Sequence, residues 1–192
     1  MNLPNKITIL RIILIPFFIF FYLASFVPYG KIIATVILIL ACITDAVDGH
    51  IARKYNMVTD LGKLLDPIAD KAFSVSALLL LVADQTIPAP YGVIVAIIIL
   101  IRDFTVSGLR QIAASKNFVL AADFWGKIKS IILDVALPVL FVLSYLINDL
   151  SMTLKNFVLY YAIFGYSLLA IATLLTIYSG VNYLIKNRQV LK

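Results

Sequence analysis

Residues 45–53 read Asp45-Ala46-Val47-Asp48-Gly49-His50-Ile51-Ala52-Arg53, and Gly62, Asp66 and Asp70 follow in a chain that is otherwise strongly apolar. Four carboxylates therefore lie within 26 residues. An ionised aspartate near the centre of a bilayer costs roughly 2.5–3.5 kcal/mol, so four unpaired ones cost about 10–14 kcal/mol. Two divalent cations would cancel the four negative charges, so the segment indicates a site for cations.

The composition indicates that a bilayer surrounds this segment. Apolar residues make up 62% of the 192 residues and the mean hydropathy is +1.03, whereas a soluble domain is roughly 45–50% apolar. The length predicts a single domain over residues 1–192. With one cysteine, Cys42, the chain has no disulfide framework.

Apolar runs of about 20 residues, long enough to cross about 30 Å of hydrocarbon, identify six helices. We expect them at residues 7–27, 32–52, 62–83, 90–113, 127–147 and 157–185. The predicted fold is therefore all-α, a polytopic membrane protein with six transmembrane helices. The first run also has features of a signal peptide, but its length and the internal Pro16 favour a retained helix.

Basic residues are distributed unevenly between the two sides of the predicted bundle. The connections after the first, third and fifth helices contain only Lys31, no basic residue and only Lys155, respectively. The other side has eleven basic residues, namely Lys6, Arg11, Arg53, Lys54, Lys63, Lys116, Lys127, Lys129, Lys186, Arg188 and Lys192. Because cytoplasmic loops retain positive charge, we expect both termini in the cytoplasm and the protein in the cell membrane. The net charge of +6 suits anionic lipid headgroups, not nucleic acid, since exposed aromatic residues are not interleaved with the basic ones.

The spacing of the aspartates places them on facing helices. Asp45 and Asp48 share one face of the second expected helix, and Asp66 and Asp70 share one face of the third. A short connection makes these helices antiparallel neighbours, so the two pairs can face each other. At 1.5 Å per residue from the helix start, Asp45 lies about 20 Å from the outer end, and the site opens toward the cytoplasm.

The residue types at this site favour metal-assisted chemistry at phosphorus. Hard oxygen ligands favour Mg²⁺, Mn²⁺ or Ca²⁺ over zinc, and a paired site suits two cations that stabilise the attacking and leaving oxygens. Arg53, one turn beyond, is placed to bind a phosphate with two hydrogen bonds. Gly49 and Gly62 leave room for a ligand, although small residues also serve close helix packing in membranes. The single histidine, His50, points away from the Asp45 face, which favours a structural role.

The pattern Asp45-x2-Asp48-Gly49-x2-Ala52-Arg53-x8-Gly62-x3-Asp66-x3-Asp70 resembles the signature of the CDP-alcohol phosphotransferase family at every specified position. Members of that family are six-helix membrane enzymes, usually homodimers, which transfer a substituted phosphate from a CDP-linked donor to a hydroxyl group and release CMP. The resemblance implies that two divalent cations, Mg²⁺ or Mn²⁺, are held by Asp45, Asp48, Asp66 and Asp70. It also implies that Asp70 is the catalytic base and that the CDP-lipid is received by Asp45, Gly49, Ala52, Arg53 and Gly62.

The acceptor is indicated by basic residues in the later helices. Arg102 and Arg110 lie eight residues apart on the fourth expected helix and Lys127 opens the fifth, a set that favours an acceptor with its own phosphate. A structural alternative pairs Arg102 with Asp134 and treats Lys127 and Lys129 as snorkelling anchors.

Three outer motifs sharpen the resemblance to one branch of the family. These are residues 3–11, Arg102-Asp103 with residues 107–110, and residues 126–130. They resemble the branch that uses CDP-diacylglycerol as donor and glycerol 3-phosphate as acceptor. The chain departs from it at Asp103, where Glu is common, and at Ser130, where Thr is expected, and both changes keep the functional group. Asn5 and Thr8 are placed at the rim of the nucleotide pocket.

Alternatives stay open at this point. The same chemistry with phosphatidylglycerol, serine or inositol phosphate as acceptor fits the aspartates equally well. A divalent-cation transporter would also use intramembrane carboxylates, but it does not need the ordered glycine, alanine and arginine positions. A membrane prenyltransferase would be expected to show a second aspartate cluster, which this sequence lacks. Asp84 is expected to be a solvated turn residue, and Asp123 and Asp134 receive no role.

Overall fold

The computed structural model describes residues 3–54, 60–116, 120, 123–148 and 155–191. Within these ranges, side chains are not described at 3, 4, 46, 48–54, 60, 61, 63, 64, 114, 115, 155, 190 and 191. The predicted positions Asp48, Gly49, Ala52 and Arg53 therefore lie on a described helix, but their side chains lie outside the described part.

Six long helices make up the described chain, and no strand occurs in it. They are α1 (Leu3–Leu23), α2 (Gly30–Lys54), α3 (Asp60–Ala83), α4 (Ala89–Ser115), α5 (Phe124–Asn148) and α6 (Lys155–Lys186), followed by the short 3-10 helix η1 (Arg188–Leu191). The all-α expectation is confirmed. Four of these helices, α1, α4, α5 and α6, are long and apolar enough to cross a membrane.

The helix bounds agree with the predicted apolar runs to within a few residues. The largest difference is at α1, which begins at Leu3 and ends at Leu23, whereas the run was expected at 7–27. Hydropathy alone does not mark this end, since Phe26 and Val27 are apolar but belong to the turn that leads into α2. Tyr29 has a positive φ of 61° in that turn, which a helix does not accommodate.

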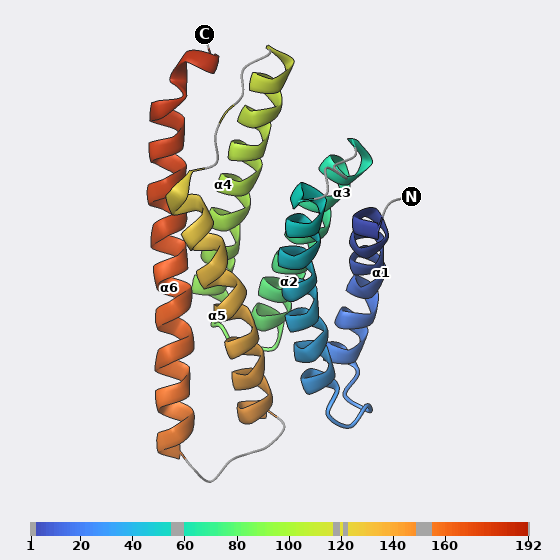
Figure 1. The fold of residues 1–192 in the computed structure, drawn as a ribbon. Helices are drawn as coiled ribbons and strands as arrows, with labels where there is room; N and C mark the ends of the chain where they lie inside the picture. The colour runs from blue at the N-terminus through green and yellow to red at the C-terminus, as the bar shows by residue number, and fades with distance from the viewer. Residues whose placement is uncertain (1–2, 55–59, 117–119, 121–122, 149–154, 192) are drawn as a thin grey trace.

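The helices form a bundle in which both chain termini lie at the same end (Figure 1). We call this the terminal end and the other the far end. α1 packs against α2 and α3, α5 packs against α6, α2 and α3, and α4 packs against α3 and α6. At the centre, the ring of Phe18 on α1 lies 5.7 Å from Phe73 on α3 and 5.3 Å from Phe141 on α5. This aromatic contact joins α1 to both α3 and α5.

A polar cluster closes the far end of the bundle. Asp84, in the turn after α3, accepts hydrogen bonds from the hydroxyls of Tyr22 and Ser144 and from the backbone N–H of Thr86 at 3.0 Å. Lys31 lies 3.4 Å from the same carboxylate. We call Tyr22, Lys31, Asp84, Thr86 and Ser144 the Asp84 cluster. The expectation that Asp84 is a solvated turn residue is wrong, because the turn folds back onto α1 and α5 and buries much of the carboxylate.

Candidate active site

One face of α1 carries the first polar residues of the site. Asn5, Thr8 and Arg11 recur every three residues and are at most 5% exposed, so they point into the bundle. Thr8 donates a hydrogen bond of 2.7 Å to Oδ1 of Asp66 on α3. Arg11 forms an ion pair with Oδ1 of Asp45 on α2. Helix α1 therefore joins the two helices that carry the predicted metal ligands.

Arg11 was not among the site residues predicted from the sequence. From the sequence, it is a basic residue of the cytoplasmic side and the last residue of the motif over residues 3–11. The signal that identifies it is its register with Asn5 and Thr8, since three polar residues spaced by three on an apolar helix must share one face. A buried arginine on that face requires an anionic partner, and Asp45 provides it.

Asp70 makes the fewest direct contacts among the predicted ligands whose side chains are described. Its side chain is exposed, and it makes no hydrogen bond or ion pair with another described residue. It lies within electrostatic range of Asp45, Asp103 and Asp134, all of like charge, and of the cations Lys129 and Arg11. The fold therefore brings carboxylates from α2, α3, α4 and α5 toward one region.

Asp134, which the sequence left without a role, belongs to this carboxylate region. It projects from α5 within electrostatic range of Asp45 and Asp70, and it also has no hydrogen bond or ion pair with another described residue. Carboxylates that repel each other in an apolar surrounding are costly unless a cation joins them. Asp70 and Asp134 therefore carry negative charge that no described cation neutralises by direct contact.

The donor set fits a hard divalent cation. Among the described side chains, however, no three carboxylate, histidine or cysteine groups are already arranged to hold a metal ion. Arg11 contacts one oxygen of Asp45, Thr8 contacts one oxygen of Asp66, and Asp70 has no direct partner. Carboxylate oxygens of this kind are the preferred ligands of Mg²⁺ and Mn²⁺. The fourth predicted ligand, Asp48, lies one helical turn from Asp45, and its side chain is outside the described part.

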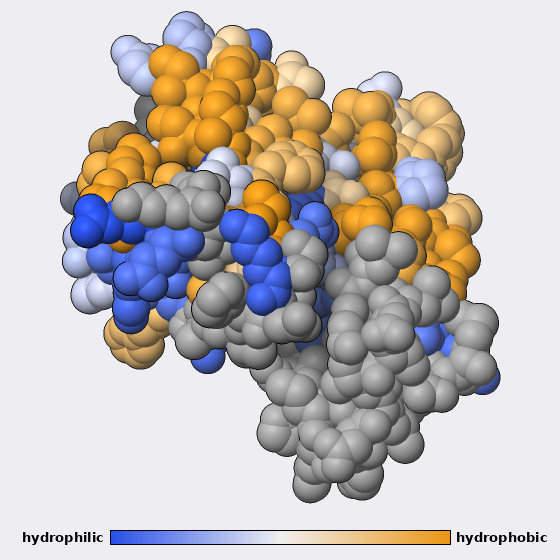
Figure 2. All heavy atoms as spheres, turned by 90° about the horizontal axis from the view of Figure 1, so that it is seen from above, coloured by the Kyte–Doolittle hydropathy of each residue, from blue (hydrophilic) through white to orange (hydrophobic). Residues whose placement is uncertain are grey.

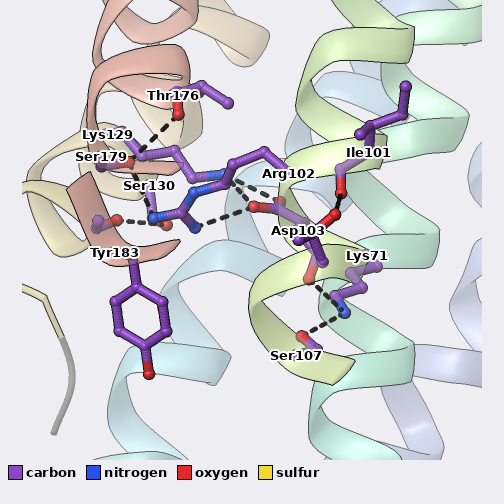
Figure 3. A network of polar contacts seen from close by, with 12 residues as sticks. Lys71, Ile101, Arg102, Asp103, Ser107, Lys129, Ser130, Thr176, Ser179 and Tyr183 are labelled. Carbon is purple, nitrogen blue, oxygen red and sulfur yellow. Dashed lines mark hydrogen bonds and ion pairs between the residues drawn. The ribbon is translucent and has the colours of Figure 1, made fainter. Parts of the chain in front are cut away.

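A second polar cluster lies beside these carboxylates and joins α3, α4 and α5 (Figure 3). Lys129 on α5 donates to both oxygens of Asp103 on α4, at 2.8 and 2.9 Å. Lys71, next to Asp70 on α3, donates to Oγ of Ser107 at 2.7 Å and lies 3.3 Å from the carbonyl oxygen of Asp103. We call Lys71, Arg102, Asp103, Ser107 and Lys129 the Asp103 cluster.

Lys129 is 2% exposed, so the alternative that it snorkels to the membrane surface is wrong. Lys127, two residues away, is exposed. The difference follows from helix geometry, because residue 129 shares its face with the buried Leu133, Leu137 and Leu140 whereas residue 127 does not. This register was readable in the sequence and would have singled out Lys129.

Arg102 crosses from α4 toward α6. Its Nη1 lies 3.1 Å from Oδ1 of Asp103 and its Nη2 donates to Oγ of Ser179 at 2.9 Å. The alternative partner Asp134 is not used. A Cβ added at Gly126 would lie 2.6 Å from Nη2 of Arg102, and one at Gly180 would lie 2.8 Å from its Cγ. The side chain of Arg102 therefore passes close to both glycines, where a larger residue would collide with it.

Arg110 lies two helical turns beyond Arg102, and its side chain is exposed. Its Nε donates to the hydroxyl oxygen of Tyr183 on α6 at 3.2 Å, and its guanidinium carbon lies 5.6 Å from the centre of the Tyr183 ring. Arg110 is also within electrostatic range of Lys71. Seen from the terminal end, hydrophilic side chains gather on one part of the surface, beside apolar ones (Figure 2).

The predicted residues fall into two groups in space. Asn5, Thr8, Asp45, Gly62, Asp66 and Asp70 come from α1, α2 and α3. The predicted acceptor residues Arg102, Arg110 and Lys127 come from α4 and α5. The Asp103 cluster, which includes Arg102, connects these helices to α3. The arrangement can place a cation-bound phosphate on one side and an anionic acceptor on the other.

Comparison with known proteins covers almost the whole chain. A family model described as CDP-alcohol phosphatidyltransferase matches residues 1–178. A Bacillus subtilis protein named CDP-diacylglycerol–glycerol-3-phosphate 3-phosphatidyltransferase is 38% identical and covers 100% of this chain and 97% of its own length. A protein of the same name from Haemophilus influenzae is 37% identical over 95% of this chain and 91% of its own length. A probable phosphatidylglycerophosphate synthase from Mycobacterium tuberculosis is 36% identical over 95% of this chain and 79% of its own length.

Proposed function

This chain belongs to the CDP-alcohol phosphatidyltransferase family, and we propose that it transfers the phosphatidyl group of CDP-diacylglycerol to glycerol 3-phosphate, giving phosphatidylglycerophosphate and CMP. The observation that carries the proposal is a match to relatives of this name along essentially the entire chain. The carboxylate region supports it, because Asp70 and Asp134 have no direct partner among the described residues.

The family is generally dependent on divalent metal ions, and we assign that role to carboxylates of α2 and α3. Asp45, Asp48, Asp66 and Asp70 would hold two divalent cations, Mg²⁺ or Mn²⁺. When bound, the cations would neutralise charge on the phosphate that is transferred. Arg11 and Thr8 hold one oxygen each of Asp45 and Asp66, which fixes the direction of both carboxylates before any ligand binds.

The reaction needs a proton acceptor and correct positioning but no covalent nucleophile on the protein. In the proposed step, the acceptor hydroxyl oxygen forms a bond to the phosphorus that bears the diacylglycerol. The bond between this phosphorus and the bridging oxygen of CMP breaks, and CMP leaves with that electron pair. The hydroxyl proton passes to Asp70, the predicted ligand without a direct partner among the described side chains.

Two sets of residues would bind the substrates. We assign the CDP-lipid to Asn5, Thr8, Asp45, Gly49, Ala52, Arg53 and Gly62, which lie on α1, α2 and the start of α3. We assign the acceptor's phosphate to Arg110, Lys127 and Arg102. Arg110 is the best placed of these three, since both Nη groups of Arg102 are already engaged by Asp103 and Ser179.

We further propose that the chain is one domain over residues 1–192 that crosses the cell membrane six times. Both termini and the active site would face the cytoplasm, and the enzyme would be a homodimer. The location of exposed Lys6, Lys116, Lys127, Lys186 and Arg188 supports this orientation, because they lie toward the terminal end of the bundle.

The test is CMP release by the purified protein in detergent with CDP-diacylglycerol and Mg²⁺ or Mn²⁺. Glycerol 3-phosphate, serine, inositol 1-phosphate and phosphatidylglycerol are supplied separately, with a reaction lacking acceptor as control. We expect release only with glycerol 3-phosphate, loss of release with a chelator and recovery with added metal.

Each other outcome has a definite meaning. Release driven by a different acceptor would keep the carboxylate chemistry and overturn the acceptor assignment. Absence of release with every acceptor would favour the cation transporter, which uptake of Mn²⁺ into vesicles would then test directly. Release that persists after metal removal would overturn the metal assignment.

A further inference from the structure

We propose that Tyr183 is a positioning residue that holds Arg110 so that both of its terminal nitrogens face the phosphate of the acceptor. The inference rests on the proposed function, because its readout is the use of glycerol 3-phosphate. It adds a residue that the sequence did not indicate and that lies beyond residue 178, where the family match ends.

The hydrogen bond between these residues selects one nitrogen of the arginine. Nε of Arg110 donates to the Tyr183 hydroxyl oxygen at 3.2 Å, while Nη1 and Nη2 make no hydrogen bond or ion pair with another described residue. A guanidinium binds phosphate best with two parallel N–H donors. With Nε occupied, the pair that remains available is Nη1 with Nη2, so the bond also fixes which edge of the arginine is presented.

The tyrosine is itself held rigidly, which a positioning role requires. Tyr183 is 3% exposed and packs in a small core with Val106, Leu109 and Ala113 of α4. Leu109 is adjacent to Arg110, so the ring is anchored on the helix whose arginine it orients. The ring also lies within cation–π distance of the guanidinium, at 5.6 Å.

The surroundings of Arg110 favour an anion as its ligand. Arg110 is exposed, makes no ion pair with a described carboxylate, and lies within electrostatic range of another cation, Lys71. Ser107, which binds Lys71, lies three residues before Arg110 on the same face of α4. Lys71 is within electrostatic range of both Arg110 and Asp70, and no described carboxylate contacts Arg110. The terminal nitrogens of Arg110 can therefore bind an anion such as a phosphate.

The test is a double-mutant cycle of Tyr183→Phe and Arg110→Ala, with steady-state kinetics of CMP release for both substrates. Tyr183→Phe keeps the packed ring and removes only the hydroxyl. We expect a KM for glycerol 3-phosphate raised about three- to tenfold, with kcat and the KM for CDP-diacylglycerol nearly unchanged. In the Arg110→Ala background the same change should have no further effect, since the tyrosine acts through the arginine.

Tyr178→Phe is the matched control. It makes the same chemical change on the same helix, but Tyr178 is 54% exposed and its hydroxyl has no hydrogen-bond partner among the described residues. We expect its KM values to equal those of the wild type. An equal effect of Tyr183→Phe with and without Arg110 would overturn the positioning role, as would an unchanged KM in the single variant. A wild type that does not use glycerol 3-phosphate would instead refute the proposed function.

Discussion

The two ends of this bundle hold aspartates in opposite ways. At the far end, the single carboxylate of Asp84 accepts hydrogen bonds from the hydroxyls of Tyr22 and Ser144 and from the backbone N–H of Thr86. It also lies beside Lys31. Toward the terminal end, by contrast, Asp70 and Asp134 have no direct partner among the described side chains.

The contrast separates a structural carboxylate from candidate functional ones. A buried carboxylate whose oxygens are all satisfied stabilises the packing of the elements that donate to it. Carboxylates that repel one another without direct partners destabilise the apoprotein, and a cationic ligand relieves that cost. The sequence sets Asp70 apart through the aspartate pattern, but it predicts a solvated Asp84 and gives Asp134 no role. The difference between Asp84 and Asp134 arises from the donors that the fold brings to each.

The largest expected effect is a loss of activity when Asp70, one of the aspartates without a direct partner among the described side chains, is changed. Asp70→Asn should lower kcat for CMP release by about 10²- to 10⁴-fold, because an amide cannot accept the acceptor's proton. Binding of CDP-diacylglycerol, measured by equilibrium binding of labelled lipid in detergent, should remain largely intact. Equal loss of donor binding and turnover would make Asp70 a metal ligand without a role as base.

The companion substitution at the far end should act on stability alone. Asp84→Asn removes the negative charge that lies 3.4 Å from Nζ of Lys31 and keeps one acceptor oxygen where the carboxylate had two. We expect a loss of about 1.5–3 kcal/mol in the free energy of unfolding, seen as a lower melting temperature in detergent. At a temperature where the variant is fully folded, kcat should match the wild type. A tenfold lower kcat under those conditions would break the distinction between the two ends.

Much of the fold was predictable because it depends on local chemistry. The six helices follow from apolar runs, and their bounds agree to a few residues. The convergence of Asp45 and Asp70 follows from spacing and from a short connection between their helices. These inferences need only helix geometry and hydropathy.

The partners of the polar residues were not predictable in the same way. Hydropathy predicted Asp84 to be a solvated turn residue. The turn after α3 instead folds against Tyr22 and Ser144, which lie 62 and 60 positions away in the chain. Whether Lys127 or Lys129 is buried depends on the helix register. The register can be read from the spacing of the leucines, but a count of basic residues ignores it. The pairing of Arg11 with Asp45 needed α1 to lie beside α2, a fact of tertiary packing.

A third prediction tests whether the Asp103 cluster is structural like the far end. Gly180→Ala would place a Cβ 2.8 Å from Cγ of Arg102, the stem of a side chain bonded to Asp103 and Ser179. We expect a net destabilisation of about 1–2 kcal/mol after the helix-propensity gain of alanine, measured by thermal unfolding. Gly108→Ala is the control for melting temperature, since nothing lies within 4 Å of its added Cβ. Equal melting temperatures for the two variants would mean that Arg102 moves aside freely.

The smallest expected effect is a pH dependence confined to the far end. Burial alone would raise the pKa of Asp84, but hydrogen bonds from Ser144, Tyr22 and Thr86 outweigh it, so the pKa lies below the ordinary value of 3.8. A carboxyl whose folded pKa is depressed adds stability above its unfolded pKa and loses it as pH falls through the folded one. The melting temperatures of wild type and Asp84→Asn should therefore differ by a constant amount above about pH 5 and converge below about pH 4. All other carboxyl groups titrate in both proteins and cancel in the difference, so a gap that widens on acidification would mean that Asp84 is held in its neutral form, and the two ends of the bundle would then no longer differ in kind.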